Sequence, residues 1–210
     1  MKTKNSTVTT EPDNTSPLAE HLAWMVEKCT ACGLCRKECA FLKKYGKPQE
    51  IAQSYDPDRD SAMAFECSLC NLCTAVCPFK INPAAMFLAM RREAVRQGKG
   101  EFPEHQAIRG YEKQGFSSLF SYYGLPQGCD TVFFPGCGLP GTRPDKVIKL
   151  FSHLRQSIPA LGIVLDCCTK PSHDLGDQDF FETMFFELKR YLLEKGVTTV
   201  IVACPNCYKV

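Results

Sequence analysis

Two cysteine-rich stretches, CTACGLCRKECA at residues 29–40 and CSLCNLCTAVCP at residues 67–78, decide how the first half of this chain folds. In both, four cysteines follow one another at the spacing Cys-x2-Cys-x2-Cys-x3-Cys. Three thiols spaced two residues apart can wrap around one metal cluster through a short loop, whereas the fourth lies about one helical turn further on and points elsewhere. Each stretch therefore predicts a cluster site and leaves one cysteine for a neighbouring cluster.

The second stretch ends in the Cys-Pro pair of the bacterial run that binds [4Fe-4S] clusters, in which the fourth cysteine ligates the other cluster. We therefore expect two cubane [4Fe-4S] clusters that exchange one ligand. The ligands of the first cluster would be Cys29, Cys32, Cys35 and Cys77. The ligands of the second cluster would be Cys67, Cys70, Cys73 and Cys39. This exchange would hold the clusters side by side, as a relay of electrons requires.

Zinc is the alternative metal, because a tetrahedral site of sulfur ligands suits zinc as well as iron. Structural zinc usually takes two pairs of ligands separated by a long loop, so the tight runs of four cysteines favour iron. Disulfides are disfavoured because they need an oxidising compartment, and residues 1–17 contain no apolar stretch like that of an export signal. We therefore expect a protein of the reducing cytoplasm.

The composition is that of an ordinary soluble protein. The 210 residues are 44% hydrophobic and 23% charged, and the formal net charge of +2 gives no field that indicates a nucleic-acid partner. The apolar runs are far shorter than the roughly 20 residues that cross a bilayer. We expect no direct membrane insertion, so that any membrane association would go through a partner.

The segment between the two cysteine stretches indicates which kind of module holds them. Residues 40–66 contain a single β-branched residue, Ile51, which disfavours strands. We therefore expect an all-α ferredoxin-type domain over residues 16–98. Residues 1–15 are too polar to pack and are expected to form a disordered tail. Residues 99–128 show no clear period and are interpreted as a packed linker.

A different pattern begins at residue 129 and runs to residue 210. The segments TVFFPGC (131–137), GIVLDCC (162–168) and TTVIVACPNC (198–207) are short apolar strands separated by two amphipathic helices, which predicts a parallel α/β sheet. The fold class as a whole is therefore α+β, with an all-α module followed by a partial parallel α/β module. Because sites in such sheets gather beyond the carboxyl ends of the strands, the cysteines that follow the strands should converge. These are Cys137, Cys167, Cys168, Cys204 and Cys207.

The motifs FFPGC, LDCCTKPSHDLGD and VACPNC resemble the cysteine-rich domain of heterodisulfide reductase and its relatives. These relatives include the iron-sulfur subunits of glycolate oxidase, of lactate-utilisation systems and of anaerobic glycerol-3-phosphate dehydrogenase. Several of them join a helical two-cluster ferredoxin to such a domain, so the resemblance covers residues 18–210. It implies that the five cysteines hold a noncubane [4Fe-4S] assembly that works on a disulfide, or that the domain accepts electrons within a dehydrogenase complex.

The chain departs from the family pattern at two places. Thr169 follows the paired cysteines where the family has glycine, and a β-branched residue resists the positive φ that glycine accepts. We therefore expect a reshaped loop at Cys167 and Cys168. The sequence also stops three residues past Cys207, where the family continues, so we expect a C-terminally incomplete domain with one face of the sheet short of cover.

Other polar and sulfur-bearing residues are given structural roles. Cys129 precedes the first strand and fits no motif, which favours a buried thiol. His173 lies in the turn after the paired cysteines, where a structural role is expected. The arginines of the helix that starts near Pro83 are interpreted as a solvated face, with docking of an acidic partner as the alternative. These are Arg91, Arg92 and Arg96.

The expected function is electron transfer through two [4Fe-4S] clusters, in a subunit of a heterodisulfide reductase-like or FAD-dependent dehydrogenase complex. Disulfide reduction at a third, noncubane cluster would be the enzymatic variant. The alternatives are a noncatalytic two-cluster carrier whose truncated second domain only docks partners, and a zinc-stabilised interaction module. The expected partners are redox proteins such as a flavoprotein dehydrogenase or a membrane-bound cytochrome subunit. The chain has no phosphate-binding glycine motif for a flavin or nicotinamide of its own.

Overall fold

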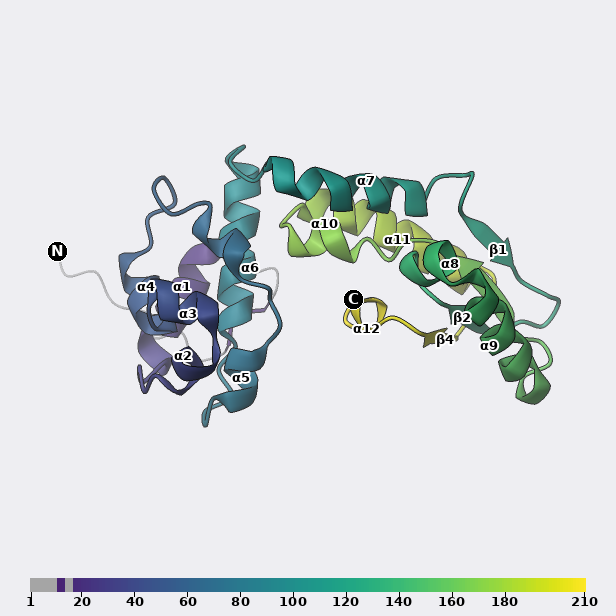
Figure 1. Ribbon diagram of the computed structural model, residues 1–210, viewed down its shortest axis with the longest axis horizontal. Helices are drawn as coiled ribbons and strands as arrows, with labels where there is room; N and C mark the ends of the chain where they lie inside the picture. Colours follow the sequence, from purple (N-terminus) through teal and green to yellow (C-terminus); the bar gives the residue numbers. More distant parts are fainter. Residues whose placement is uncertain (1–10, 14–16) are drawn as a thin grey trace. The chain divides into compact units, whose positions relative to one another are not determined.

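The computed structural model describes residues 11–13 and 17–210 and divides into two compact units (Figure 1). Unit 1 contains residues 1–101 and 174–176, and unit 2 contains residues 102–173 and 177–210. The tail expected over residues 1–15 falls outside the described residues, apart from residues 11–13.

The described part of unit 1 is helical, as the composition between the cysteine stretches predicted. Its elements are α1 (Leu18–Lys28), α2 (Leu34–Glu38), α3 (Ala40–Tyr45), α4 (Pro48–Ser54), the 3-10 helix η1 (Met63–Glu66), α5 (Leu72–Val76) and α6 (Pro83–Arg96). Helix α1 packs against α4 and α6, and the two short helices α2 and α5 pack against each other. The cysteine loops are thereby attached to a helical scaffold.

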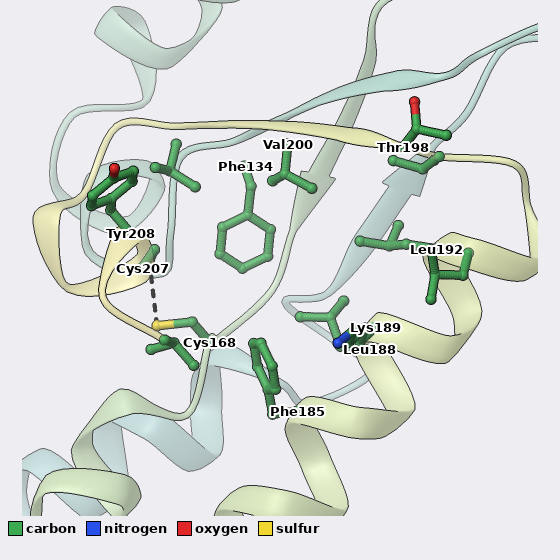
Figure 2. Close-up of a pocket in the computed structure, with 14 residues that line it drawn as sticks. Phe134, Cys168, Phe185, Leu188, Lys189, Leu192, Thr198, Val200, Cys207 and Tyr208 are labelled. Carbon is green, nitrogen blue, oxygen red and sulfur yellow. Dashed lines mark hydrogen bonds between the residues drawn. The ribbon is translucent and has the colours of Figure 1, made fainter. Parts of the chain in front are cut away.

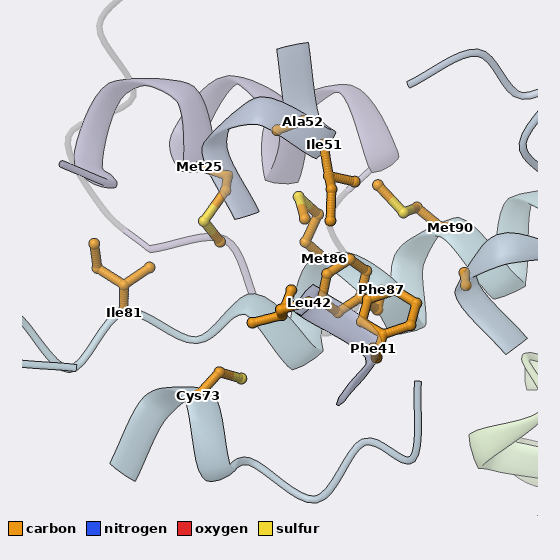
Figure 3. Close-up of a cluster of buried hydrophobic side chains, with 11 residues drawn as sticks. Met25, Phe41, Leu42, Ile51, Ala52, Cys73, Ile81, Met86, Phe87 and Met90 are labelled. Carbon is orange, nitrogen blue, oxygen red and sulfur yellow. The ribbon is translucent and has the colours of Figure 1, made fainter. Parts of the chain in front are cut away.

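An apolar core holds these helices together (Figure 3). Met25 of α1, Leu42 of α3 and Phe87 of α6 are each 1% exposed. The ring of Phe87 makes an edge contact with Phe41 at 4.9 Å between the ring centroids. Such contacts add to the stabilisation from burial, so the core fixes the helices from which the cysteine loops extend.

Unit 2 contains a four-stranded mixed sheet with accompanying helices (Figure 1). In chain order its elements are η2 (Pro103–His105), α7 (Gln106–Gly115), β1 (Tyr122–Gly124), β2 (Thr131–Phe134), α8 (Gly138–Thr142), α9 (Pro144–Ser157), β3 (Gly162–Leu165), α10 (Lys170–Asp174), α11 (Gln178–Glu194), β4 (Thr199–Val202) and α12 (Pro205–Tyr208). The strand order is β1-β3-β2-β4. Strand β2 pairs in parallel with both β3 and β4, as the alternating pattern of strands and helices predicted.

The sheet is mixed because β1 pairs with β3 in the antiparallel direction. The prediction of a wholly parallel sheet was therefore wrong at this edge. Strand β1 has only three residues, YYG, which are too few to show the alternation by which a strand is recognised. The same stretch, interpreted as a linker, also contains α7.

Side chains of β2 alternate between two apolar clusters, as successive residues of a strand do. Phe133 packs with Val147 of α9 in one cluster, whereas Val132 and Phe134 pack with Leu192 of α11 in the other. The sheet therefore has a helix against each face. This arrangement leaves the carboxyl ends of the strands as the edge where loops can gather.

Helical cover is thinner beside β4. An apolar cavity of about 360 Å³ lies between β4, α11 and α12 (Figure 2). Phe134 and Leu192 line its inner wall, and Val200 and Tyr208 line the part near the surface. Val200 is 46% exposed although it is apolar.

Candidate metal centres

The two cysteine loops of unit 1 have the same backbone shape. In the first loop Ala31 and Gly33 have φ values of 52° and 80°, and in the second loop Leu69 and Asn71 have values of 50° and 62°. In each loop these residues stand directly before and after the second cysteine of the run. A left-handed conformation costs a non-glycine residue about 1–2 kcal/mol. Strain repeated at equivalent positions is typical of a loop held in shape for binding.

The first loop borders a cavity that cysteines from both stretches line. Cys29 follows α1, Cys35 lies in α2 and Cys77 follows α5, and all three line this cavity together with Cys32. The fourth cysteine of the second stretch therefore lies beside the first loop, where an exchanged ligand would have to be. Cys73 also contributes to the lining.

At the second loop, the fourth cysteine of the first stretch lies close by. Burial raises the pKa of Cys67, and the neighbouring sulfur atoms of Cys39 and Cys70 raise it further. The structure thus brings Cys39 near Cys67. Cys70 and its counterpart Cys32 are exposed, so both loops reach the surface of unit 1.

The chemistry of these groups fits an iron-sulfur cluster. Soft thiolate donors in fours are the ligands of [4Fe-4S] clusters. Burial raises the pKa of Cys35 and of Cys73 to about 11, so iron must displace protons from these thiols at neutral pH. Within residues 11–13 and 17–210, no three His, Cys, Asp or Glu side chains are placed to hold one metal ion together. The thiols of the two loops would instead suit clusters, which take four thiolate ligands each.

Arg91 of α6 supports the second loop, and the sequence interpretation missed it. Its guanidinium donates hydrogen bonds to the carbonyl of Ala64, at 3.0 Å, and to the carbonyl of Cys67. The side chain is only 5% exposed, so the interpretation of Arg91 as solvated was wrong. The available signal was its spacing, because Arg91 shares the buried stripe of α6 with Phe87 and Ala94.

In unit 2 the cysteines that follow the strands come together at the carboxyl edge of the sheet. The Sγ atoms of Cys137 and Cys167 lie 3.8 Å apart. Those of Cys168 and Cys207 lie 3.3 Å apart, and Figure 2 shows this second pair beside the cavity. Cys204 interacts with Cys207 through its side chain. The convergence expected from the strand order is therefore present in the structure.

A glycine makes this approach possible. Gly136 has φ of 77°, which other residues adopt only with strain. A Cβ atom at this position would lie 3.0 Å from the Sγ of Cys207 and 3.4 Å from the Cβ of Cys204. The glycine of the FPGC motif thus lets the loop after β2 contact the loop after β4.

The sulfur atoms form two pairs with unequal proton affinity. A hydrogen bond from the Cys167 thiol lowers the pKa of Cys137 to about 7, and the same interaction raises the pKa of Cys167. A hydrogen bond from Cys207 lowers the pKa of Cys168 in the same way, and the pKa of Cys207 rises. Each pair therefore favours one thiolate and one thiol, so that a thiolate ligand is available on each side of the site.

Thr169 keeps the backbone conformation that a glycine would have. Its φ is 52°, so the expected reshaping of the loop at Cys167 and Cys168 is not what the structure has. The side chain is 1% exposed, and its hydroxyl has no hydrogen-bond partner in the part of the chain that the structure describes. The substitution is therefore accommodated as strain and as an unsatisfied buried hydroxyl.

The remaining candidates have structural surroundings. Cys129 is buried, as expected, and its thiol donates to the carbonyl of Thr131 at 3.3 Å. The ring of His173 packs against Phe181 with 4.9 Å between centroids. Arg96 is exposed and pairs with Glu93. These contacts fit the structural roles given to Cys129 and His173 and the solvated position given to Arg96.

Comparison with known proteins defines the class of the chain. Residues 25–81 match the family model described as a 4Fe-4S dicluster domain, and this segment contains both cysteine loops. The chain therefore contains a [4Fe-4S] domain of the kind found in iron-sulfur electron-transfer proteins.

A particular relative extends the likeness to the second half of the chain. The chain is 23% identical over 232 aligned residues to one subunit of the dihydromethanophenazine:CoB--CoM heterodisulfide reductase of Methanosarcina mazei, with 88% of the chain and 56% of the relative covered. The two matches confirm the resemblance inferred from the cysteine motifs. The chain spans about half the length of the curated relative it matches. No solved structure gives a significant match.

None of the helices formed by residues 11–13 and 17–210 has the length and apolar character needed to cross a bilayer.

Proposed function

We propose that the chain is an electron-transfer subunit whose first module binds two [4Fe-4S] clusters. Cys29, Cys32, Cys35 and Cys77 would hold one cluster. Cys67, Cys70, Cys73 and Cys39 would hold the other. The observation that carries this proposal is the matched geometry of the two loops. Both have left-handed residues on either side of the second cysteine, and the fourth cysteine of each stretch lies beside the loop of the other stretch. The clusters supply one-electron redox chemistry when bound, and the chain supplies burial, ligand geometry and a route to the surface.

We propose a third iron-sulfur site at the carboxyl edge of the sheet. Its ligands would be Cys137, Cys167, Cys168, Cys204 and Cys207. Four of them form two close sulfur pairs and Cys204 interacts with Cys207, which supports this assignment. The relative, which is named as part of a heterodisulfide reductase, supports it as well. Reduction of a disulfide at this site is the proposed enzymatic variant. The second candidate function is a two-cluster carrier whose cysteine-rich domain only docks partners, and the exposed apolar surface at Val200 favours it.

The proposed partners are a flavoprotein dehydrogenase and a membrane-bound cytochrome subunit, with the chain itself in the cytoplasm. The name of the relative as one subunit of a reductase supports a multisubunit assembly. We retain the division into a ferredoxin-type domain over residues 16–98, a linker over residues 99–128 and a cysteine-rich domain over residues 129–210 as part of the proposal. Cys32 and Cys70 are exposed, so clusters bound there would lie close to the surface. This position would suit electron transfer between proteins.

Metal analysis after anaerobic purification tests the proposal. About eight irons and eight sulfides per chain are expected from the two cubanes, and about twelve irons if the third site is filled. Zinc in place of iron, or a colourless chain made with ample iron, would contradict the proposal. Eight irons with full cubane spectra would favour the carrier.

Ligand exchange has a test of its own. Cys70→Ser should remove one cubane and perturb the other, because Cys39 and Cys77 join the two sites. Electron paramagnetic resonance would follow both signals. Cys129→Ser is the matched control, since Cys129 is a buried cysteine outside both loops. Two unchanged cubane signals in Cys70→Ser would reject the assignment.

A further inference from the structure

Helix α7, in the stretch that the sequence pattern suggested is a linker, lies against the five-cysteine site. Three of its residues make this contact: Tyr111, Glu112 and Gly115. They are spaced at i, i+1 and i+4, which places them on one side of the helix. The hydroxyl of Tyr111 donates to the carbonyl of Cys137 at 3.2 Å.

Gly115 is the point of closest approach. A Cβ atom built at Gly115 would lie 3.0 Å from the Cβ of Cys137 and 3.1 Å from the Cβ of Cys167. Both atoms are attached directly to the backbone, so they can yield only if the cysteine loops move. The φ of Gly115 is outside the left-handed region, so its backbone does not require glycine. The need is for space beside Cys137 and Cys167.

Glu112 holds the loop that follows the paired cysteines. Its side chain is 2% exposed. One carboxylate oxygen accepts the backbone N–H of Ser172 at 3.0 Å, and the other accepts the hydroxyl of Ser172. Ser172 lies in α10, which begins two residues after Cys168. Burial of a carboxyl group costs free energy unless the group is hydrogen-bonded. We therefore interpret the two hydrogen bonds to Ser172 as a positioning role for Glu112.

We propose that α7 is a wall of the five-cysteine site, in which Gly115 leaves room for the metal at Cys137 and Cys167, and Tyr111 and Glu112 are positioning residues. This inference rests on the proposed iron-sulfur site of unit 2. Glycine is a poor helix former, and its presence in the last turn of α7 is explained by the space that it leaves. The site thus draws its walls from α7 as well as from the three parallel strands.

A pair of glycine substitutions in the same helix tests the role of Gly115. Gly110 has open space around its Cβ position, so Gly110→Ala is the matched control for Gly115→Ala. We expect Gly110→Ala to keep about twelve irons and Gly115→Ala to fall to about eight, with cubane signals unchanged. Retention of twelve irons by Gly115→Ala would overturn the proposal.

A measurement of thiol cross-linking tests the proposed role of α7 independently of whether the third cluster forms. In the full chain with its cubanes assembled and the third site empty, a mild diamide treatment takes two electrons and two protons from each close thiol pair and leaves a disulfide. Peptide mapping then compares the cross-link between Cys137 and Cys167 with that between Cys168 and Cys207. Gly115→Ala should lower only the first by at least about threefold, because the three atoms nearest to the added Cβ all belong to that pair. Equal cross-linking in wild type and variant would count against the wall even if wild type binds only eight irons.

Glu112 is tested by rescue. Glu112→Ala removes both acceptors from Ser172, whereas Glu112→Gln keeps one carbonyl oxygen that can accept from it. We expect loss of iron from the third site and a lower cross-link between Cys137 and Cys167 in Glu112→Ala. Glu112→Gln should restore most of both. An alanine variant that matches wild type in both readouts would refute a positioning role.

Discussion

At the scale of single residues, Thr169 and Arg91 show two ways in which this chain holds a cysteine loop. Thr169 keeps a positive φ without being glycine, and Arg91 places a buried charge under the carbonyl of Cys67. Sequence reasoning identified the unusual threonine but predicted a different backbone for it. It missed Arg91 because the basic half of α6 suggested a solvated surface. Local composition therefore pointed to these positions, but it did not predict the backbone conformation of Thr169 or the burial of Arg91.

Replacing Thr169 by glycine should stabilise unit 2. The change removes a left-handed β-branched residue and a buried hydroxyl without a partner among the described residues. The relief of strain should exceed the cost of the extra conformational entropy that glycine gives the unfolded chain. We therefore expect the free energy of unfolding to rise by about 1 kcal/mol. Anaerobic chemical denaturation measures it. Thr169→Ala is the control, because it removes the hydroxyl and keeps the Cβ, and it should gain less. If Thr169→Gly were less stable than wild type, the conclusion that Thr169 is strained would be wrong.

Arg91→Met should destabilise unit 1 and deplete the second loop of metal. Four backbone carbonyls would lose this donor, those of Ala64, Phe65, Cys67 and Asp174. The expected cost is about 2–4 kcal/mol in the free energy of unfolding. Thermal unfolding and iron content would measure both effects. Arg96→Met serves as the control because the Arg96 side chain is 74% exposed, and it should change stability little. Equal behaviour of the two variants would show that Arg91 does not support the loop.

The buried carboxyl of Glu112 should make the stability of the chain depend on pH. Burial raises the pKa of its carboxyl, against the opposing effect of the hydrogen bonds from Ser172. The folded chain then binds more protons than the unfolded chain above the ordinary carboxyl pKa of about 4.5. The stabilising protonated form is fully present below that value and is lost as the pH rises through the higher folded pKa. Glu112→Gln should therefore gain stability relative to wild type as the pH rises above about 4.5, measured as a difference in unfolding free energy. A difference that is flat with pH would exclude the buried carboxyl as its source.

At the scale of elements, the sequence predicted those with a clear period or start signal. Helix α6 begins with Asn82 and Pro83, and the Asn82 side chain accepts the N–H of Ala85 at 3.3 Å. The three parallel strands were recognised from their apolar runs. Strand β1 and α7 were missed because three strand residues give no alternation, and because the face of α7 that packs on the site carries glycine and glutamate in place of apolar residues.

The start of α6 gives a test at this scale. Asn82→Ala removes the acceptor for the N–H of Ala85 and should lower the free energy of unfolding by about 1 kcal/mol. The effect should appear as a lower thermal midpoint of the metal-loaded chain. Asn82→Asp keeps an acceptor oxygen and should stay close to wild type. If both variants unfold alike, the side-chain hydrogen bond does not stabilise α6.

At the scale of the whole molecule, spacing of cysteines was the strongest signal. It indicated both the matched dicluster segment and the likeness to the reductase before any geometry was known. What spacing could not indicate was the support around the sulfur atoms, since Arg91 and Glu112 lie far in sequence from the loops that they hold. Such contacts arise only when helices pack, and no local pattern encodes them.

Charge at the mouth of the first cysteine loop gives a prediction for partner binding. Exposed apolar side chains of Leu34 and Phe79 line the same cavity as the cysteines. Lys37 and Lys80 are exposed and follow two of these cysteines closely, two residues after Cys35 and three after Cys77. Reversal of both lysines to glutamate should slow reduction by an acidic flavodoxin about tenfold at low salt, because attraction speeds encounter. Stopped-flow kinetics would measure the rate. Lys149→Glu on α9 is the control. A rate that neither variant changes would exclude steering at this surface.

Strand β4 lies at one end of the strand order, and its first two residues are exposed. In the described structure its outer row of peptide groups therefore faces no further strand, and Val200 adds an apolar surface beside it. A row of this kind is a template on which another polypeptide can lengthen the sheet. In concentrated solution, copies of this chain alone should accordingly adhere to one another along β4, so dilute samples are the better choice for spectroscopy.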